Sequence, residues 1–542
     1  MYLSNPEALK KILLKLVECP SLSGTEKERE MAEIIHKILL EIPYFTRNPE
    51  HLELIEIEND KYNRCFVSAL LKGKGRNTVI LLHHHDVVGV DDYGSLKEDA
   101  FYPDKITAKL QKLDIPEKAR KDLDSGEWQF GRGVMDMKAG AALQIALLHD
   151  FSEEECLEGN VLLLSVPGEE SNSEGMLAAV PYLNILQEKY DLDYVAVVNS
   201  EPHDTDEQGH NDITIGSIGK IMPVFYCFGK ETHASAPFEG FNSALLFSQV
   251  EAEMENNIEL CDRFEDEISP PPVNLKNKDL KELYNVTTPQ VTVGYFNVFM
   301  MQRTISDISR ILKVIASKAF NNALKLQKEK AERFADLSGK KHEVPWKTNV
   351  YMFEELYEKA YKAHGKEFKN HLDEYIKDLQ TTEEDEREFT IKLIDAVHNF
   401  CPDREPKIVI AFAPPYYPHI RNKGETDKEK YLLKVLDRIK EYGRDNFNIE
   451  FRVTKMYEGI TDLSYCGLQD PMILTYLKPN MPALGHIYDL PIEDLQTLNT
   501  AVINIGPLGR DAHKFTERLY MPYFEEILPS LLKYTVYQLL KF

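Results

Sequence analysis

The chain has 542 residues, of which 43% are hydrophobic and 28% are charged, as in ordinary globular proteins. A chain of this length can form two or three domains with substantial cores. Its formal net charge of −25 argues against a general nucleic-acid binder, which needs a basic surface, and no apolar run approaches the length that crosses a membrane.

Cysteine usage and the first residues indicate the compartment in which the protein works. The seven cysteines are scattered and form no CxxC pair, so neither a disulfide scaffold nor a cysteine-based metal site is expected. Residues 1–7 lack the basic region and apolar core of a signal peptide. We therefore expect a cytoplasmic protein with reduced thiols.

The N-terminal part of the chain begins with helical patterns and continues with strands. Residues 7–18 and 25–41 are predicted helices, the second with its apolar residues on one face. Ser23 with Glu26 three residues later matches a capping box before the second helix. Two predicted strands, which we expect to pair, follow at residues 65–71 and 78–82.

Residue types that bind metals follow several short apolar runs. Runs rich in Val, Ile and Leu predict buried strands of an α/β sheet, and binding sites in such sheets lie beyond the carboxyl ends of the strands. Two histidines and four carboxylates gathered there are the composition of a two-metal hydrolase. The residues in these places are His84, after 79–82; Asp136, in the glycine-rich stretch 131–140; Glu169 and Glu170, after 161–166; Glu201, after 194–198; and His513, after 501–506.

Two of these positions also have simpler interpretations. Asp136 precedes a predicted helix at 141–148, and an aspartate there is often only an N-cap; the other ligand-type residues favour the metal role. In the run His-His-His-Asp at 83–86, alternate side chains share a face, which groups His84 with Asp86. A carboxylate beside an imidazole is the arrangement that orients a metal-binding histidine, and either neighbouring histidine stays open as the ligand.

In their order along the chain, these motifs resemble those of the M20 metallopeptidases, a family that also includes aminoacylases and related deacylases. The family's His-x-Asp pattern selects His84 and Asp86 within the histidine run. A further matching stretch, 229–237, contains His233. Within the family, the length of the chain and the stretch 460–465 are most similar to the arginine-utilisation (RocB-type) proteins.

The resemblance implies a fold and a domain organisation. It implies an α/β catalytic domain of the phosphorylase/hydrolase-like zinc-peptidase type, formed by residues 1–217 and 457–542. An α+β, ferredoxin-like lid is then inserted at 218–456. Residues 303–400 are strongly helical and charged, and we interpret them as an additional helical insertion into that lid.

The resemblance also implies a role for each site residue. The expected cofactors are two divalent metal ions, zinc by default, although manganese or cobalt would fit the same ligands. The general base, the proton shuttle to the leaving amine and the oxyanion stabiliser follow the family pattern. The assignments are Asp136 bridging both ions, Glu170 and His513 on one ion, His84 and Glu201 on the other, Asp86 orienting His84, Glu169 as general base, and His233 stabilising the oxyanion.

The expected function is hydrolysis of an amide bond in a small peptide or N-acyl amino acid, with a place in arginine catabolism implied by the narrower resemblance. A homodimer is expected if His233 acts across a subunit interface, and no nucleic-acid or membrane partner is expected. Two alternatives stay open. One is a metal-dependent deacylase that acts on a non-peptide amide, and the other is a non-enzymatic descendant that binds a ligand or partner through residues 303–400.

Overall fold

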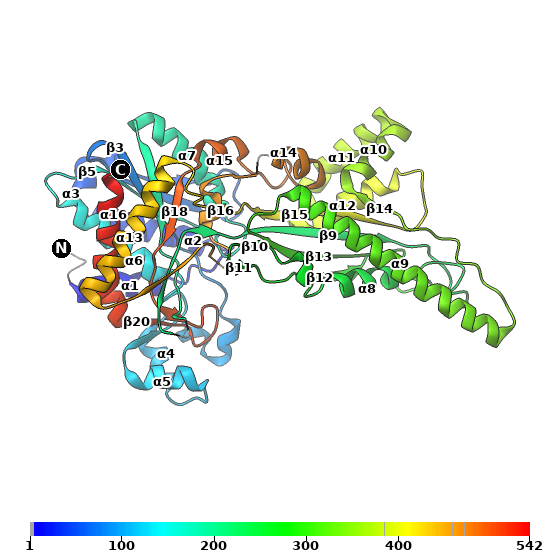
Figure 1. Ribbon diagram of the computed structural model, residues 1–542, viewed down its shortest axis with the longest axis horizontal. Coiled ribbons are helices and arrows are strands. Elements are labelled where there is room, and N and C mark those ends of the chain that lie inside the picture. Colours follow the sequence, from blue (N-terminus) through cyan, green and yellow to red (C-terminus); the bar gives the residue numbers. More distant parts are fainter. Residues whose placement is uncertain (1–4, 207, 384, 458, 471) are drawn as a thin grey trace. The chain divides into compact units, whose positions relative to one another are not determined.

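The computed structural model describes two compact units (Figure 1). The described residues are 5–206, 208–383, 385–457, 459–470 and 472–542. Unit 1 comprises Met1–Ser217, Ile420–Leu468 and Pro491–Phe542, and unit 2 comprises Ile218–His419 and Gln469–Leu490. The chain therefore enters unit 2 twice and returns to unit 1 each time.

Unit 1 is built on an eight-stranded mixed sheet. Its central strands β5, β3, β6 and β18 are parallel, and their Val-, Ile- and Leu-rich residues are buried on both faces, as in sheets covered by helices. Parallel strands end at one edge, so the residues that follow β3, β5 and β6 meet there. In sheet order the strands are β1 (Leu52–Glu56), β2 (Cys65–Leu71), β5 (Glu158–Val166), β3 (Lys74–His84), β6 (Asp193–Asn199), β18 (Ala501–Asn504), β7 (Asn211–Thr214) and β17 (Phe451–Thr454).

Helices bury the faces of this sheet. The apolar sides of α1, α2, α6, α13 and α16 share one core with alternate residues of the strands, whereas α7 packs against β2 and β5 and is joined by α15. Because most of α6 is buried in this core, the loop that precedes it is held against the sheet. The main helices of unit 1 are α1 (Pro6–Val17), α2 (Lys27–Leu40), α3 (Pro43–Arg47), α4 (Pro103–Leu110), α5 (Glu117–Ser125), α6 (Lys138–Ser152), α7 (Glu174–Tyr190), α13 (Asp427–Phe447), α15 (Ile492–Leu498) and α16 (Leu528–Leu540).

A small antiparallel sheet joins two distant parts of unit 1. β4 (Trp128–Phe130) pairs with β20 (Arg518–Tyr520), which pairs with β19 (Gly509–Arg510). β4 leads into the glycine-rich loop, and the β19–β20 connection carries the last predicted ligand. The pairing therefore brings two predicted metal-binding segments together although nearly 400 residues separate them.

Unit 2 is an α+β structure built on a five-stranded sheet. α8 packs on β9 and β13, and α9 packs along α8; the opposite side of the sheet shares a core with α10, α11 and α12. The strands in order are β12 (Val273–Asp279), β13 (Val291–Met300), β9 (Gly219–Phe228), β15 (Lys407–Tyr417) and β14 (Val350–Met352). The helices are α8 (Ser243–Met254), α9 (Ile305–Ser338), α10 (Phe353–His364), α11 (Lys366–Thr382), α12 (Glu386–Asn399) and α14 (Ile473–Tyr476).

The predicted fold class, an α/β catalytic part with a second α+β part, is confirmed, but the expected lid of 218–456 differs from the observed division. β17 pairs in parallel with β7 at the edge of the unit 1 sheet. α13 buries Leu432 and Val435 in the unit 1 core. Both elements therefore satisfy their hydrogen bonds and apolar faces in unit 1, and the chain leaves unit 2 near His419 rather than at 456.

Two local expectations are wrong. β2 and β3 do not pair, because β5 lies between them, antiparallel to β2 and parallel to β3. Ser23 and Glu26 do not form a capping box. Instead, Glu28 Oε1 accepts the backbone N–H groups of Gly24 at 2.7 Å and Thr25 at 3.3 Å, so the start of α2 is held by its own first turn.

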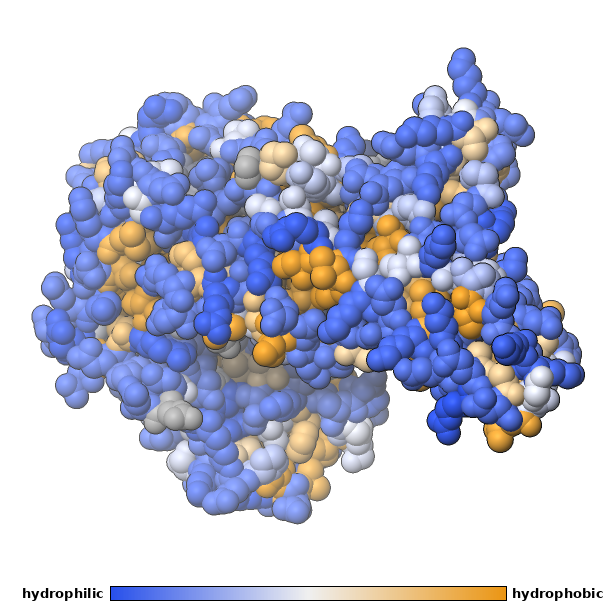
Figure 2. All heavy atoms as spheres, turned by 45° about the vertical axis from the view of Figure 1, so that its right-hand side comes forward, coloured by the Kyte–Doolittle hydropathy of each residue, from blue (hydrophilic) through white to orange (hydrophobic). Residues whose placement is uncertain are grey.

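The face of the molecule shown in Figure 2 is mostly hydrophilic, with separate hydrophobic patches. This agrees with the excess of carboxylates in the composition. Within the described ranges, each helix is either too short or too polar to span a bilayer.

Candidate metal centre

The predicted ligands of unit 1 meet at the carboxyl edge of its sheet. His84 is the last residue of β3, Glu169 and Glu170 follow β5, and Glu201 follows β6. Asp136 lies in the loop before α6. The last predicted ligand lies between β19 and β20. Five segments therefore bring these side chains into one region, as their positions after buried strands predicted.

The three adjacent histidines have different surroundings. His83 Nδ1 lies 2.9 Å from Gln144 Oε1, and His85 Nδ1 lies 2.9 Å from Ser165 Oγ. Burial lowers the pKa of His83 to about 4 and that of His85 to about 3. Both are therefore neutral packing residues at pH 7, and His84 is the histidine of this run that faces the acidic side chains.

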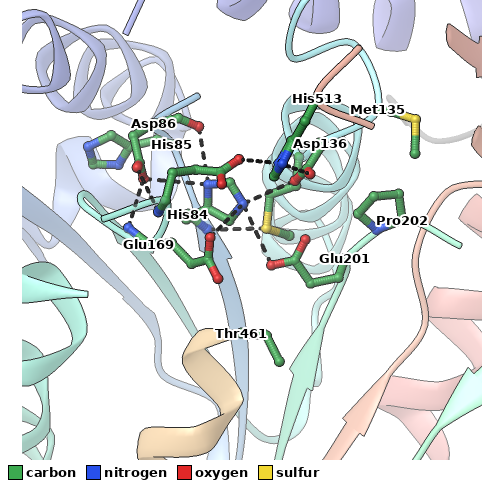
Figure 3. A network of polar contacts seen from close by, with 12 residues as sticks. His84, His85, Asp86, Met135, Asp136, Glu169, Glu201, Pro202, Thr461 and His513 are labelled. Carbon is green, nitrogen blue, oxygen red and sulfur yellow. Dashed lines mark hydrogen bonds and ion pairs between the residues drawn. The ribbon is translucent and has the colours of Figure 1, made fainter. Parts of the chain in front are cut away.

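His84 contacts a carboxylate or carbonyl through each ring nitrogen (Figure 3). Its Nε2 lies 3.3 Å from Asp136 Oδ1 and 3.6 Å from Glu201 Oε1. Its Nδ1 lies 3.1 Å from the backbone oxygen of Asp86 and 3.5 Å from the carboxylate of that residue. An Nδ1–H that donates toward Asp86 leaves the Nε2 lone pair directed at the acidic cluster, which is the orientation of a metal-binding imidazole.

Asp136 lies between the two histidines (Figure 3). Its Oδ1 faces His84, and its Oδ2 lies 3.1 Å from His513 Nε2. His513 Nε2 also lies 2.9 Å from Glu170 Oε1. One ligand atom each from His84, Asp136 and Glu170 lie within 4.8 Å of one another. A carboxylate with one oxygen toward each imidazole has the geometry of a bridging ligand.

Asp86 holds the backbone of the two adjacent glutamates. Its Oδ1 accepts the N–H of Glu169 at 3.2 Å, and its Oδ2 accepts the N–H of Glu170 at 3.1 Å. Glu169 is 8% exposed, and its Oε2 lies 3.9 Å from His84 Nε2. The Glu169 carboxylate therefore lies beside His84 at a distance longer than a hydrogen bond.

The charges of the centre favour a cation. Burial, with Asp136 and Glu170 nearby, raises the pKa of Glu201 to about 7 against the lowering effect of His84. Bonds to Asp136 and Glu170 raise the pKa of His513 to about 10. Among the described residues, the ion pairs of these carboxylates are with the two histidines alone. Buried carboxylates with nitrogen donors and no lysine or arginine partner are the donor set of a divalent-metal site, so the residues fit the metals that the sequence implies.

Two buried residues outside the predicted set hold the Asp136 loop. Arg132 donates to Glu517 Oε2 at 2.6 Å and to Asp92 Oδ1 at 3.0 Å. Glu517 Oε1 also accepts the N–H of Met135 at 3.4 Å. Arg132 and Glu517 are at most 1% exposed. Glu517 therefore fixes the loop backbone rather than facing the metal centre.

Asn504 is a supporting residue that the sequence reasoning missed. Its Oδ1 accepts the N–H of Glu201 at 2.8 Å, and its Nδ2 donates to the Glu201 carbonyl at 3.1 Å. Gly506 allows this close approach, since a Cβ there would lie 1.9 Å from the same carbonyl oxygen. An asparagine inside the apolar run 501–506 was the available signal, because a buried amide needs partners.

His233 belongs to unit 2, whereas the other seven predicted site residues belong to unit 1. It is exposed, and its Nδ1 accepts the N–H of Ser235 at 3.2 Å. Ser235 Oγ lies 2.7 Å from the same nitrogen, so Ser235 orients the ring through Nδ1. Its segment forms an antiparallel bridge to Thr287, and Gln327 on α9 donates to the Gly240 carbonyl at 2.6 Å. The predicted helical insertion thus begins with a helix that holds the loop of His233.

Comparison of the sequence with known proteins identifies the family of the chain. The model for peptidase family M20/M25/M40 matches residues 113–406. The chain is 36% identical over 537 residues to the uncharacterised protein YqjN of Bacillus subtilis, covering 98% of this chain and 96% of that protein. It is 33% identical over 549 residues to Protein RocB of the same organism, covering 99% and 96%.

Solved structures agree in fold. An M20 family metallo-carboxypeptidase, Sso-CP2 from Sulfolobus solfataricus, superimposes with a TM-score of 0.52 at 12% identity, covering 98% of this chain and 99% of that chain. A sequence identity this low supports similarity of fold only. The family assignment rests on the sequence matches. The chain belongs to peptidase family M20/M25/M40 and is a metal-dependent hydrolase of C–N bonds.

Proposed function

We propose that the protein hydrolyses an amide bond in a short peptide or an N-acyl amino acid, and that it holds two divalent metal ions. The observation that carries the two-ion proposal is the position of Asp136, with one carboxylate oxygen toward His84 and the other toward His513. We propose His84 and Glu201 as the remaining ligands of one ion, and Glu170 and His513 as those of the other. Zinc is the proposed metal, because imidazole and carboxylate ligands suit it, and manganese or cobalt would suit the same set.

Glu169 is the proposed general base and acid. Divalent ions at this centre would polarise the scissile carbonyl and lower the pKa of water. Glu169 would take the proton from the attacking water and return it to the nitrogen of the leaving amine as the C–N bond breaks. The Asp86 clamp on the N–H of Glu169 supports this role, since it fixes the backbone from which the carboxylate reaches the reacting atoms.

His233 is the proposed donor to the oxyanion that forms on the carbonyl carbon. Ser235 engages its Nδ1, so we propose Nε2 as the ring nitrogen that donates. We propose that this histidine acts from the partner in a homodimer. In support, β12 is an edge strand whose Val273 and Leu275 are exposed, and Tyr284, near the segment that bridges His233, is 92% exposed. Exposed apolar residues beside an open strand edge favour association with another chain.

The compartment and the pathway are further proposals. All seven cysteines are free thiols, which supports a reducing compartment such as the cytoplasm. The place in arginine catabolism stays a prediction from the narrower resemblance. Peptidase and deacylase reactions would cleave an amide by the same proposed steps. Rates on a panel of dipeptides and N-acyl amino acids would therefore decide between them.

Metal content per chain tests the proposal directly. Elemental analysis of the wild type should give about two ions per chain after reloading with zinc, by the two-metal geometry. Asp136→Ala should lose both, because each ion shares that carboxylate. Asp124→Ala is the matched control, since Asp124 is an exposed carboxylate of α5 with a 4.0 Å pair to Arg120, and it should keep the wild-type content. A wild type without tight metal, after reloading with zinc, manganese and cobalt, would contradict the proposal.

A further inference from the structure

Gln144 makes an unusual set of contacts for a residue with no predicted role. It lies on α6, is 0% exposed, and bonds to four groups on two strand ends. Its Nε2 lies 2.9 Å from the Leu82 carbonyl, 3.3 Å from the Val198 carbonyl and 3.0 Å from Ser200 Oγ. Its Oε1 lies 2.9 Å from His83 Nδ1. Every partner therefore lies within three residues of a proposed ligand, either His84 at the end of β3 or Glu201 just after β6.

The two carbonyls fix the orientation of the Gln144 amide. A carbonyl oxygen can only accept, so the amide nitrogen must face Leu82 and Val198. The amide oxygen then faces His83, which donates from Nδ1. The two amide hydrogens serve three acceptors, with the longest contact, to Val198, shared. The side chain thus acts as a donor to both strands and an acceptor from the histidine adjacent to His84.

The start of α6 is seated against the same strand end. A Cβ on Gly140 would lie 2.4 Å from the Ser200 carbonyl oxygen, so only glycine permits this approach. The Asp136 loop leads directly into this helix. Gly140 and Gln144 are four residues apart and lie on one face of α6. The helix that follows one ligand is therefore fixed, through these two residues, to the strand ends that carry two others.

We infer that Gln144 is a positioning residue of the metal centre, which sets the spacing of Asp136, His84 and Glu201 by joining α6 to the ends of β3 and β6. This inference rests on the proposed metal-binding function. Groups that orient ligands are expected to matter for metal affinity, because a site whose ligands are held in place binds without a reorganisation cost.

A purely structural role is the alternative, and the chain offers a matched control for it. Asn160, at the start of β5, is also 0% exposed. Its Nδ2 lies within 3.4 Å of the Gly75, Arg76 and Asn77 carbonyls and of Thr78 Oγ1, and its Oδ1 accepts the N–H of Gly73. This amide joins β5 to the opposite end of β3, away from the proposed ligands. Losing either amide removes a comparable buried hydrogen-bond hub.

The test compares zinc affinity with stability. Gln144→Met and Asn160→Leu would be titrated with zinc against a chromophoric chelator, and unfolded by urea in EDTA. Both variants should unfold at lower urea. Gln144→Met should bind zinc about 10–100-fold more weakly than wild type, the usual loss for an outer-shell partner, whereas Asn160→Leu should stay within about twofold of wild type, as expected of a site distant from the ligands.

Ser200→Ala keeps the inference testable if Gln144→Met does not fold, since it deletes a single hydroxyl that bonds to Gln144. It should weaken zinc binding severalfold with little loss of stability. Wild-type zinc affinity in Gln144→Met, or in Ser200→Ala if that is the variant that folds, would overturn the inference. A wild type that binds none of zinc, manganese and cobalt would contradict the proposed function instead, so the two failures are distinguishable.

Discussion

Replacing Glu169 with glutamine should stop turnover and leave the rest of the protein intact. The backbone N–H of Glu169, which donates to Asp86 Oδ1, is unchanged in the variant. The side chain keeps its size, and its ion-pair distance to His84 Nε2 is 3.9 Å, which is longer than a hydrogen bond. Glutamine can therefore occupy the same place but cannot accept and return a proton.

The expected magnitudes follow from this geometry. General acid–base catalysis contributes about 10²–10⁴-fold in rate, so kcat should fall by that factor, or about 2.7–5.4 kcal/mol in activation free energy. The free energy of unfolding, by contrast, should not fall. Burial raises the pKa of Glu169 well above its usual range, and Glu170 and Glu201 add to this. A neutral amide removes this repulsion, so the free energy of unfolding in EDTA should be unchanged or higher.

Three measurements on one preparation check this prediction. Initial rates on dipeptides and N-acyl amino acids give kcat, elemental analysis gives metal content, and urea unfolding in EDTA gives stability. Glu158→Gln, an exposed glutamate at the start of β5, is the matched control and should behave as wild type. Glu169→Gln that keeps half of the wild-type kcat would refute the proton-transfer role. Loss of metal in this variant would instead make Glu169 a ligand.

Further predictions concern metals, packing and pH. Dialysis against a chelator should abolish activity, and zinc, manganese or cobalt should restore it, as measured by initial rates. Gly140→Ala places a methyl group 2.4 Å from the Ser200 carbonyl oxygen. It should lower the free energy of unfolding by about 1–3 kcal/mol, as measured by urea titration. Gly89→Ala is the control and should leave this free energy unchanged, since no atom lies within 4 Å of the added Cβ. Burial against Phe228 lowers the pKa of His398 to about 3, so between pH 6.5 and 3 the unfolded chain binds a proton that the folded chain does not. Stability should therefore fall by up to about 1.4 kcal/mol per pH unit as the pH drops through this range, and urea titrations of His398→Phe should lack this contribution.

The central strands of the unit 1 sheet could be predicted from the sequence. The apolar runs before His84, Glu170 and Glu201 correspond to β3, β5 and β6, because a strand buried on both faces must be apolar along its whole length. The same rule placed the ligand-type residues at one edge of the sheet. Their convergence was therefore predictable from strand ends and residue type, before any three-dimensional contact was known.

The order of the strands was not predictable in the same way. β2 and β3 are neighbours in sequence and suggested a pair, yet β5 lies between them. β17 joins the edge of the unit 1 sheet beside β7 although more than 200 residues separate the two strands. Hydrophobic periodicity and strand propensity describe one strand at a time. Which strands pair depends instead on which apolar faces and free edges meet in the folded core.

The supporting residues were hidden for a related reason. Gln144, Asn504 and Arg132 carry no motif that points to a metal, and their roles depend on partners 40 to 385 residues away. What they share is a polar group in an apolar or glycine-rich stretch. Each such group costs free energy when buried unless its hydrogen bonds are made. A buried amide or guanidinium in such a stretch is therefore itself a signal that something nearby has to be held.

The energetics of the centre explain why so many supporting bonds gather there. Asp136, Glu170 and Glu201 bring like charges together in a buried region, and the raised pKa of Glu201 reflects burial and these neighbours. Left to relax, these side chains would move apart. Asp86, Asn504 and Glu517 all accept backbone N–H groups at or next to the proposed ligands, rather than contacting the ligand carboxylates themselves. The fold thus opposes the repulsion through the main chain, and the carboxylate oxygens remain directed at the two histidines, where the proposed metal ions would bind.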